Sequence, residues 1–255
     1  MIYFIGAGPG APDLISIRGK NMLEKASMIV YAGSLVNPEL LEWAPSGCEI
    51  FDSASMTLDE VVDTMKSGVA RGFETIVRLH TGDPSLYGAV REQMDRLRAN
   101  GIAFEVIPGI SSFSAAAAAL QAEYTLPGVS QTLILTRMEG RTPVPESESI
   151  RSLASHRASM VLFLSSGMIE KLCVALVEGG YAPDTPAALV YKASWPDQKI
   201  LRTKLSDLPR AAEDAGIRKT ALVLVGNFLG DDYDLSLLYD ASFSHGYRKA
   251  KNGGA

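Results

Sequence analysis

Three stretches rich in glycine and proline carry the residues that best fit a ligand-binding role. They are GAGPGAPDL (6–14), HTGDPSLYG (80–88) and PGISS (108–112). Each follows a short apolar run of the kind that forms a strand, and helical patterns lie between the runs. In α/β sheets, ligands bind beyond the carboxyl ends of the strands. The loops would suit either a dinucleotide, whose phosphates need free backbone N–H groups, or a ligand without phosphate.

The first loop can be aligned with the G-x-G-x-x-G/A pattern of dinucleotide-binding enzymes, but three features argue against that function. Pro9 and Pro12 remove two N–H donors from the loop. The first clear helical pattern begins near Ser16, whereas the helix of a dinucleotide fold starts within the glycine turn. The second predicted strand ends in VYAGS, without the acidic residue that binds the ribose. An NAD(P)-binding oxidoreductase therefore stays only as the alternative from a different functional class.

An acidic residue in the second loop favours a ligand without phosphate. Asp83 would repel a phosphate group. It suits a cation or hydroxyl groups, and S-adenosylmethionine carries both. The small residues and hydroxyls of 108–112 would let a flat adenosine pack against the chain. Simpler roles remain open: Asp83 as the N-cap of a helix with Pro84 in its first turn, and Ser111 or Ser112 as the cap of the next helix.

Alternating strand and helix patterns position these loops. In the first half, strands are predicted at 1–6, 28–33, 48–53, 75–80 and 104–109, and helices at 16–26, 37–43, 57–71, 85–99 and 111–121. In the second half, strands are predicted at 132–137, 160–165, 187–192 and 221–226, and helices near 168–179 and 206–216. Thr57 and Glu60 have the spacing of a capping box. The alternation predicts an α/β fold with two α/β layers and mainly parallel sheets.

A break in this alternation divides the chain. YTLPGVSQ contains Pro127-Gly128 and has the composition of a linker. Beyond about residue 230 the alternation ends, and the last residues are polar and rich in glycine. The predicted organisation is an N-terminal α/β domain at 1–123, a linker at 124–131, a C-terminal α/β domain at 132–230 and a loose tail at 231–255.

Composition excludes several classes of function. The net charge is -5 and no lysine- or arginine-rich run occurs, so nucleic acid is not an expected partner. No apolar stretch approaches the roughly 18 residues of a membrane span, and the N-terminus has no signal-peptide pattern. Cys48 and Cys173 lie far apart in the sequence, which predicts neither a disulfide framework nor a metal site. We expect a cytoplasmic protein with no membrane partner.

Five motifs, taken together and in order, carry a family resemblance. They are GAGPGAPDLIS at the start, YAGSLVNPELL (31–41), TGDPSLYG (81–88), VIPGISSFSAAAAAL (106–120) and LTRMEGRTPVPE (135–146). The chain resembles the tetrapyrrole methyltransferase family over residues 1 to 230 or so. The segments YAGSLV and TRMEGRTPVPE are similar to the branch of that family that methylates C11 of the ring.

The resemblance implies a fold and an activity. The implied fold is two αβα domains with an active-site trough between them. The implied activity is methylation of precorrin-4 or cobalt-precorrin-4 at C11 by S-adenosylmethionine, giving precorrin-5 and S-adenosylhomocysteine in cobalamin (vitamin B12) biosynthesis. A homodimer is also implied. The alternatives within this class are another ring position or another substrate of the superfamily; the low basic content argues against ribosomal RNA.

The resemblance also implies a set of cofactor-binding residues, which place the cofactor against main chain. In the first domain they are Pro9, Thr81, Gly82, Asp83, Leu86, Ser111 and Ser112, and in the second Leu164, Ala193, Thr220 and Ala221. The nucleophile is a carbon of the substrate ring, so no protein nucleophile is needed. One acid or base could help to move a proton on the macrocycle, and the sequence does not identify it.

The tetrapyrrole carries acetate and propionate groups, so an acidic protein must place basic residues locally. Arg137 and Arg141 are the candidates, since guanidinium groups suit carboxylates; a solvated loop is the alternative. Tyr87 borders the second loop and is a weaker candidate for the substrate. His80 is expected to be a packing or hydrogen-bonding residue at a strand end. Trp195 has two open roles, stacking on the macrocycle or filling the domain interface.

Overall fold

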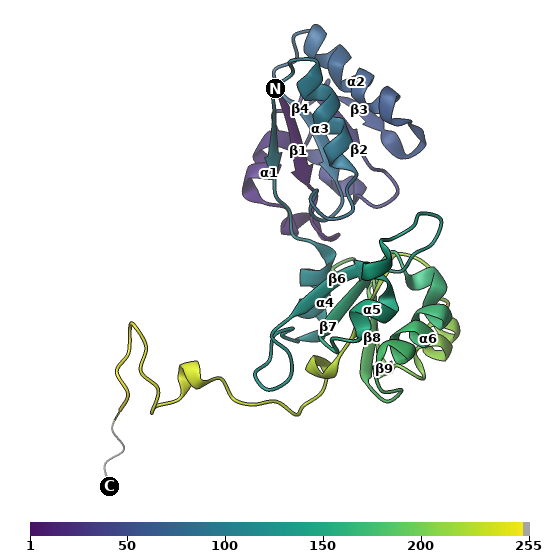
Figure 1. Ribbon diagram of the computed structural model, residues 1–255. Coiled ribbons are helices and arrows are strands. Elements are labelled where there is room, and N and C mark those ends of the chain that lie inside the picture. The colour runs from purple at the N-terminus through teal and green to yellow at the C-terminus, as the bar shows by residue number, and fades with distance from the viewer. Residues whose placement is uncertain (252–255) are drawn as a thin grey trace. The chain divides into compact units, whose positions relative to one another are not determined.

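The structure, a computed structural model, describes residues 1–251 in two compact units (Figure 1). The first unit contains Met1–Ala119 together with Lys192–Lys199. The second contains Leu120–Tyr191 and the chain from Ile200 onward. The domain limits predicted from the sequence (1–123, 124–131 and 132–230) stay a prediction, and the predicted tail at 231–255 extends beyond the described residues.

The first unit is built on a parallel sheet of five strands, as the alternating pattern predicts. The strands are β1 (Ile2–Gly6), β2 (Met28–Tyr31), β3 (Glu49–Asp52), β4 (Ile76–His80) and β5 (Phe104–Ile107). They lie in the order β3-β2-β4-β1-β5, and every neighbouring pair is parallel. The helices are α1 (Ile17–Leu23), α2 (Leu58–Ala70), α3 (Val90–Ala99) and α4 (Ser112–Leu120), with a 3-10 helix at Pro38–Trp43.

Apolar side chains alternate between the two faces of this sheet, and helices cover both faces (Figure 1). One face packs Ile5, Val77 and Leu79 against Leu23 of α1 and Leu40 of the 3-10 helix. The opposite face packs Ile2, Phe4 and Ile76 against Val61 and Met65 of α2 and Leu97 of α3. This three-layer core fixes the carboxyl ends of β4, β1 and β5 side by side.

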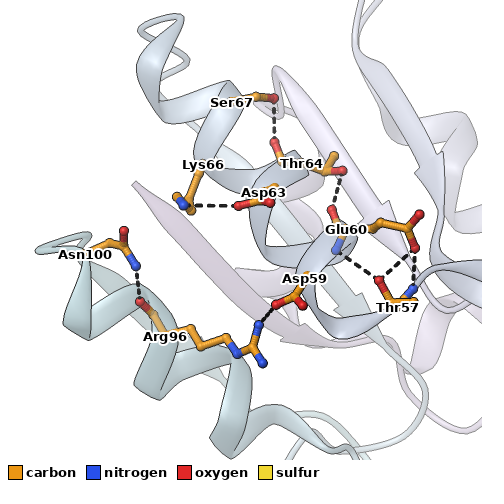
Figure 2. A network of polar contacts seen from close by, with 9 residues as sticks. All are labelled: Thr57, Asp59, Glu60, Asp63, Thr64, Lys66, Ser67, Arg96 and Asn100. Carbon is orange, nitrogen blue, oxygen red and sulfur yellow. Dashed lines mark hydrogen bonds and ion pairs between the residues drawn. The ribbon is translucent and has the colours of Figure 1, made fainter.

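The start of α2 follows the capping box that the sequence predicts. The Glu60 carboxylate accepts the Thr57 N–H at 2.7 Å, and the Thr57 hydroxyl accepts the Glu60 N–H at 3.3 Å (Figure 2). In the same first turn the Asp59 carboxylate pairs with Arg96 of α3 (Figure 2). The predicted start of α3 near residue 85 is wrong: the helix begins at Val90, because the chain first makes turns through 84–87.

The second unit contains a mixed sheet in the order β6-β7-β10-β8-β9. Its strands are β6 (Leu133–Arg137), β7 (Ser159–Phe163), β8 (Pro186–Tyr191), β9 (Lys199–Lys204) and β10 (Ala221–Val225). β6 and β7 are parallel, whereas β10 is antiparallel to both of its neighbours. The helices are α5 (Ile150–Ala154), α6 (Ile169–Gly179) and α7 (Leu208–Asp214). The predicted α/β class, with parallel and mixed sheets, is confirmed.

Two elements of the second unit escape the sequence pattern. β9 is an edge strand with charged residues at both ends, and its side chains are exposed or half-buried. It therefore lacks the apolar run by which the other strands are recognised. α5 has five residues, too few for a helical period to show. None of the helices within residues 1–251 combines the length and apolar composition that crossing a membrane requires.

Candidate functional site

The three candidate loops meet at one edge of the first sheet. β1 lies between β4 and β5, so the segments that follow these strands are neighbours. The first two loops also pair with each other. The Gly82 N–H donates to the Gly8 carbonyl at 2.8 Å, and the Gly8 N–H donates to the Gly82 carbonyl at 3.2 Å. The Ala7 N–H binds the His80 carbonyl at 2.7 Å.

Glycines allow the three loops to approach this closely. A Cβ atom added at Gly6 would lie 2.5 Å from the Gly109 Cα, and one at Gly109 would lie 2.2 Å from the Gly82 carbonyl oxygen. Gly82 itself has a φ of +60°, in the left-handed region that favours glycine. The glycines of these motifs therefore allow the backbones of the three loops to touch.

Asp83 ties the second loop to the third. One carboxylate oxygen accepts the Gly109 N–H at 2.8 Å, and the other accepts the N–H of Ser85 at 2.8 Å and its hydroxyl. Burial alone would raise the pKa of this carboxyl, but the hydrogen bonds from Ser85 and Gly109 outweigh it and lower the pKa. Asp83 is not the N-cap of α3, since Ala89 holds that position. The site therefore keeps a negative charge at neutral pH.

Several N–H groups of the first loop are used within the protein, and two positions have none. Those of Ala7 and Gly8 bind the second loop, Pro9 and Pro12 have none, and Ala11 donates to the Ser194 hydroxyl at 3.0 Å. α1 begins at Ile17, and its N-cap Ser16 accepts the Gly19 N–H. This arrangement leaves few backbone donors of the loop for a phosphate group. It fits a ligand with a positive charge and no phosphate, such as S-adenosylmethionine.

The remaining predicted residues of the first unit lie around these loops. Thr81 and Leu86 are half-buried in the second loop, Gly82 is buried, and Tyr87 is exposed. Ser111 is buried directly before α4, and its carbonyl accepts the Ser114 N–H at 3.1 Å. Ser112 is half-buried as the first residue of α4. The fold thus brings together every first-domain residue that the resemblance implies.

Trp195 belongs to the first unit, a position that the sequence does not predict. Its indole N–H donates to the Pro9 carbonyl at 3.0 Å. A Cβ atom at Gly10 would lie 2.1 Å from the indole ring. The Gly10 carbonyl accepts the Asn37 side-chain amide at 2.9 Å, and Asn37 is 5% exposed. No local pattern marks Asn37 or Trp195, because their contacts with the loop are far away in sequence.

The second-unit residues gather at one end of their own sheet. Arg137 pairs with Phe163, the residue before Leu164. Val223 pairs with Leu162 in antiparallel register, which puts Thr220 and Ala221 at the same end as Leu164. The Arg137 guanidinium donates to the carbonyls of Thr142 at 3.2 Å and Pro143 at 2.7 Å. Arg141 is exposed on the same loop.

Unusual backbone conformations coincide with several of the implied site residues. Tyr87, Leu164 and Thr220 have φ values of 54°, 53° and 58°. Lys192 and Ser194, which flank Ala193, have φ values of 46° and 70°. Residues other than glycine rarely adopt this region, and such positions cluster at functional sites. Leu164 is also 66% exposed, although it is apolar.

His80 is a packing residue, as the sequence predicts. It is 5% exposed and its ring stacks on Phe4 at 6.1 Å. Burial lowers the pKa of His80 to about 3, and the charge of Arg78 adds to that effect. Its Nε2 has no hydrogen-bond partner among the described residues. Within residues 1–251, no three His, Cys, Asp or Glu side chains gather in a way that would hold a metal ion.

The comparisons with known proteins identify a methyltransferase, here with two α/β units. Residues 1–209 match the family Tetrapyrrole (Corrin/Porphyrin) Methylases, and the chain belongs to that family. It is 52% identical to the cobalt-precorrin-4 C(11)-methyltransferase of Methanocaldococcus jannaschii, over 98% of this chain and 96% of that protein.

Two solved structures extend the comparison. A crystal structure of a cobalt precorrin-4 methyltransferase superposes with a TM-score of 0.88 at 47% identity, covering 90% of this chain and 96% of the other. A uroporphyrin-III C-methyltransferase from Thermus thermophilus, complexed with S-adenosylhomocysteine, superposes with a TM-score of 0.74 at 25% identity, covering 89% and 92%. Family membership removes the alternative of an NAD(P)-binding oxidoreductase.

Proposed function

We propose that the chain transfers the methyl group of S-adenosylmethionine to C11 of precorrin-4 or cobalt-precorrin-4, in cobalamin biosynthesis. The observation that carries this proposal is similarity along nearly the whole chain to a C11-methyltransferase. The site agrees with it, because the first loop uses the N–H groups of Ala7, Gly8 and Ala11 internally and the second keeps the Asp83 carboxylate charged.

The residues proposed for the methyl donor fall into two sets. The first comprises Pro9, Thr81, Gly82, Asp83, Leu86, Ser111 and Ser112, which lie on or beside the three loops. The second comprises Leu164, Thr220 and Ala221 of the second unit, and Ala193, which lies in the first unit and not in the predicted second domain. Unusual backbone angles occur at or beside all four. When bound, S-adenosylmethionine supplies a methyl group that is already activated. The chain's own residues then have to hold donor and ring carbon in line.

Of the three residues that the sequence suggests for the anionic tetrapyrrole, Arg137, Arg141 and Tyr87, we propose that Arg141 and Tyr87 contact it. The guanidinium of Arg137 is engaged with the carbonyls of its own loop, so its role is to hold that loop in shape. Arg141 is exposed and suits a carboxylate of the substrate. The predicted cytoplasmic location also remains a proposal, which fractionation of the source cells would test.

Mass spectrometry of the reaction products tests the function. Purified chain is incubated with S-adenosylmethionine and precorrin-4, and in a parallel arm with cobalt-precorrin-4. One added methyl group, located at C11 by NMR, is expected in at least one arm, and the ratio of the two rates identifies the preferred substrate. A methyl group at another ring carbon would replace the proposal with the alternative ring position. No methyl transfer in either arm would refute it.

A further inference from the structure

A short segment from the C-terminal half of the chain forms side-chain hydrogen bonds with the first loop. Lys192–Lys199 runs from the end of β8 to the first residue of β9, yet it belongs to the first unit. Trp195 donates its indole N–H to the Pro9 carbonyl at 3.0 Å, and Ser194 accepts the Ala11 N–H at 3.0 Å. Asn37 completes the set by donating to the Gly10 carbonyl at 2.9 Å. Three consecutive loop residues are thus each held by a side chain from elsewhere.

The shape of the loop and the shape of Trp195 fit each other. Any side chain at Gly10 would collide with the indole ring, since its Cβ would lie 2.1 Å from ring atoms. The other end of the loop is fixed by the paired N–H and carbonyl groups of Gly8 and Gly82. The loop is therefore held at both ends before any ligand arrives.

The segment Lys192–Lys199 is also stabilised by interactions between its own residues. Ser194 has a φ of 70°, and its N–H donates to the Gln198 side chain at 2.7 Å. The Lys192 ammonium lies 2.7 Å from the Asp197 carboxylate and 5.3 Å from the centre of the Trp195 ring. A strained conformation persists only where its surroundings over-determine it. These interactions indicate that the function of Lys192–Lys199 depends on a single backbone conformation.

We propose that Asn37, Ser194 and Trp195 are positioning residues of the methyl-donor site. They hold Pro9, Gly10 and Ala11 in the conformation against which the donor binds, so that binding does not have to order the loop. This inference rests on the proposed function. It assigns Trp195 to the wall of the donor site and not to stacking on the macrocycle.

Trp195→Phe is the first test, because it keeps an aromatic ring and removes the N–H donor. Losing one such hydrogen bond should weaken the binding of S-adenosylmethionine and S-adenosylhomocysteine roughly 3- to 10-fold. The KM for the methyl donor should rise by a similar factor, while the KM for the tetrapyrrole stays within about twofold of its original value. A residue with a merely structural role would not separate the two constants.

Two single-atom variants and one control complete the design. Ser194→Ala removes only the acceptor for Ala11, and Asn37→Asp removes the donor to Gly10 while an oxygen remains to accept the Glu39 N–H. Both should weaken donor binding in the same way, and they decide the matter if Trp195→Phe does not fold. Trp43→Phe changes the other tryptophan of the chain, which lies against Lys20, and should leave donor binding unchanged.

Calorimetric titration with S-adenosylhomocysteine separates the outcomes. If the three loop variants melt at lower temperature but bind with a Kd within twofold of the unaltered protein, the residues only support the fold and the inference is wrong. If the unaltered protein binds neither S-adenosylmethionine nor S-adenosylhomocysteine, the proposed function itself fails.

Discussion

At the scale of single residues, two arginines of one motif have different surroundings. The guanidinium of Arg137 donates hydrogen bonds to backbone carbonyls of the loop that follows β6. Arg141 is exposed on that loop, and no hydrogen bond or ion pair of its side chain is found within residues 1–251. Of the two, Arg141 is the better candidate for a carboxylate of the tetrapyrrole, since its charge is not engaged.

Replacing Arg141 should affect the substrate and not the fold. Arg141→Gln removes the charge from an exposed position, so we expect the KM for the tetrapyrrole to rise roughly 3- to 10-fold. The melting temperature should stay unchanged. Steady-state kinetics with varied tetrapyrrole measures the effect. Arg151→Gln, an exposed arginine of α5, is the matched control and should leave KM unaltered. Equal effects of both substitutions would point to general charge attraction.

His80 should make the stability of the protein depend on pH. Burial lowers its pKa to about 3 in the folded protein, whereas an unfolded histidine has a pKa of about 6.5. Between these pH values the unfolded chain binds one proton more at His80 than the folded protein does. The contribution of neutral His80 to the free energy of unfolding is therefore fully present above about pH 6.5 and falls as the pH drops. The loss is at most about 1.4 kcal/mol per pH unit.

Urea unfolding at about pH 7 and about pH 5 measures this dependence. His80→Gln cannot take up a proton, so the difference in unfolding free energy between the two pH values should shrink. His156→Gln alters an exposed histidine and serves as the control, with the difference retained. An undiminished difference in the His80 variant would show that other groups cause it.

At the scale of elements, β1, β4 and β5 end in loops that touch through glycine. Gly109→Ala would put a Cβ atom 2.2 Å from the Gly82 carbonyl oxygen, so a loop must shift. We expect a loss of about 2–4 kcal/mol in the free energy of unfolding. Gly101→Ala is the comparison: its φ is +68° and its Cβ meets open space, so only the conformational cost of about 1–2 kcal/mol applies. Denaturant melts compare the two, and equal losses would contradict close contact of the loops.

The sequence predicts these elements well where side chains repeat a local period. The five strands of the first sheet and the Thr57–Glu60 cap follow from alternation and spacing alone. β9 was missed because an exposed edge strand has no apolar run. The meeting of the three loops follows from the rule for strand ends. The contacts of Asn37 and Trp195 with the first loop could not be predicted, since nothing local encodes them.

At the scale of the whole molecule, the family resemblance predicts a homodimer. We propose the same for this chain. Light scattering coupled to size-exclusion chromatography should therefore give twice the chain mass of 27.3 kDa, about 55 kDa. A mass near 27.3 kDa at micromolar concentration would refute the dimer.

The hydrogen bond from Trp195 to Pro9 joins residues that are 186 positions apart in the sequence. During synthesis the first loop leaves the ribosome long before its partner exists. At about 5–20 residues per second, the interval is roughly 10–40 seconds. The parallel strands of the first unit can pair in that time, but Pro9 and Ala11 wait for Trp195 and Ser194. Nascent chains halted before residue 192 would carry an unfinished binding loop, and competence to bind the methyl donor would be acquired only near the end of translation.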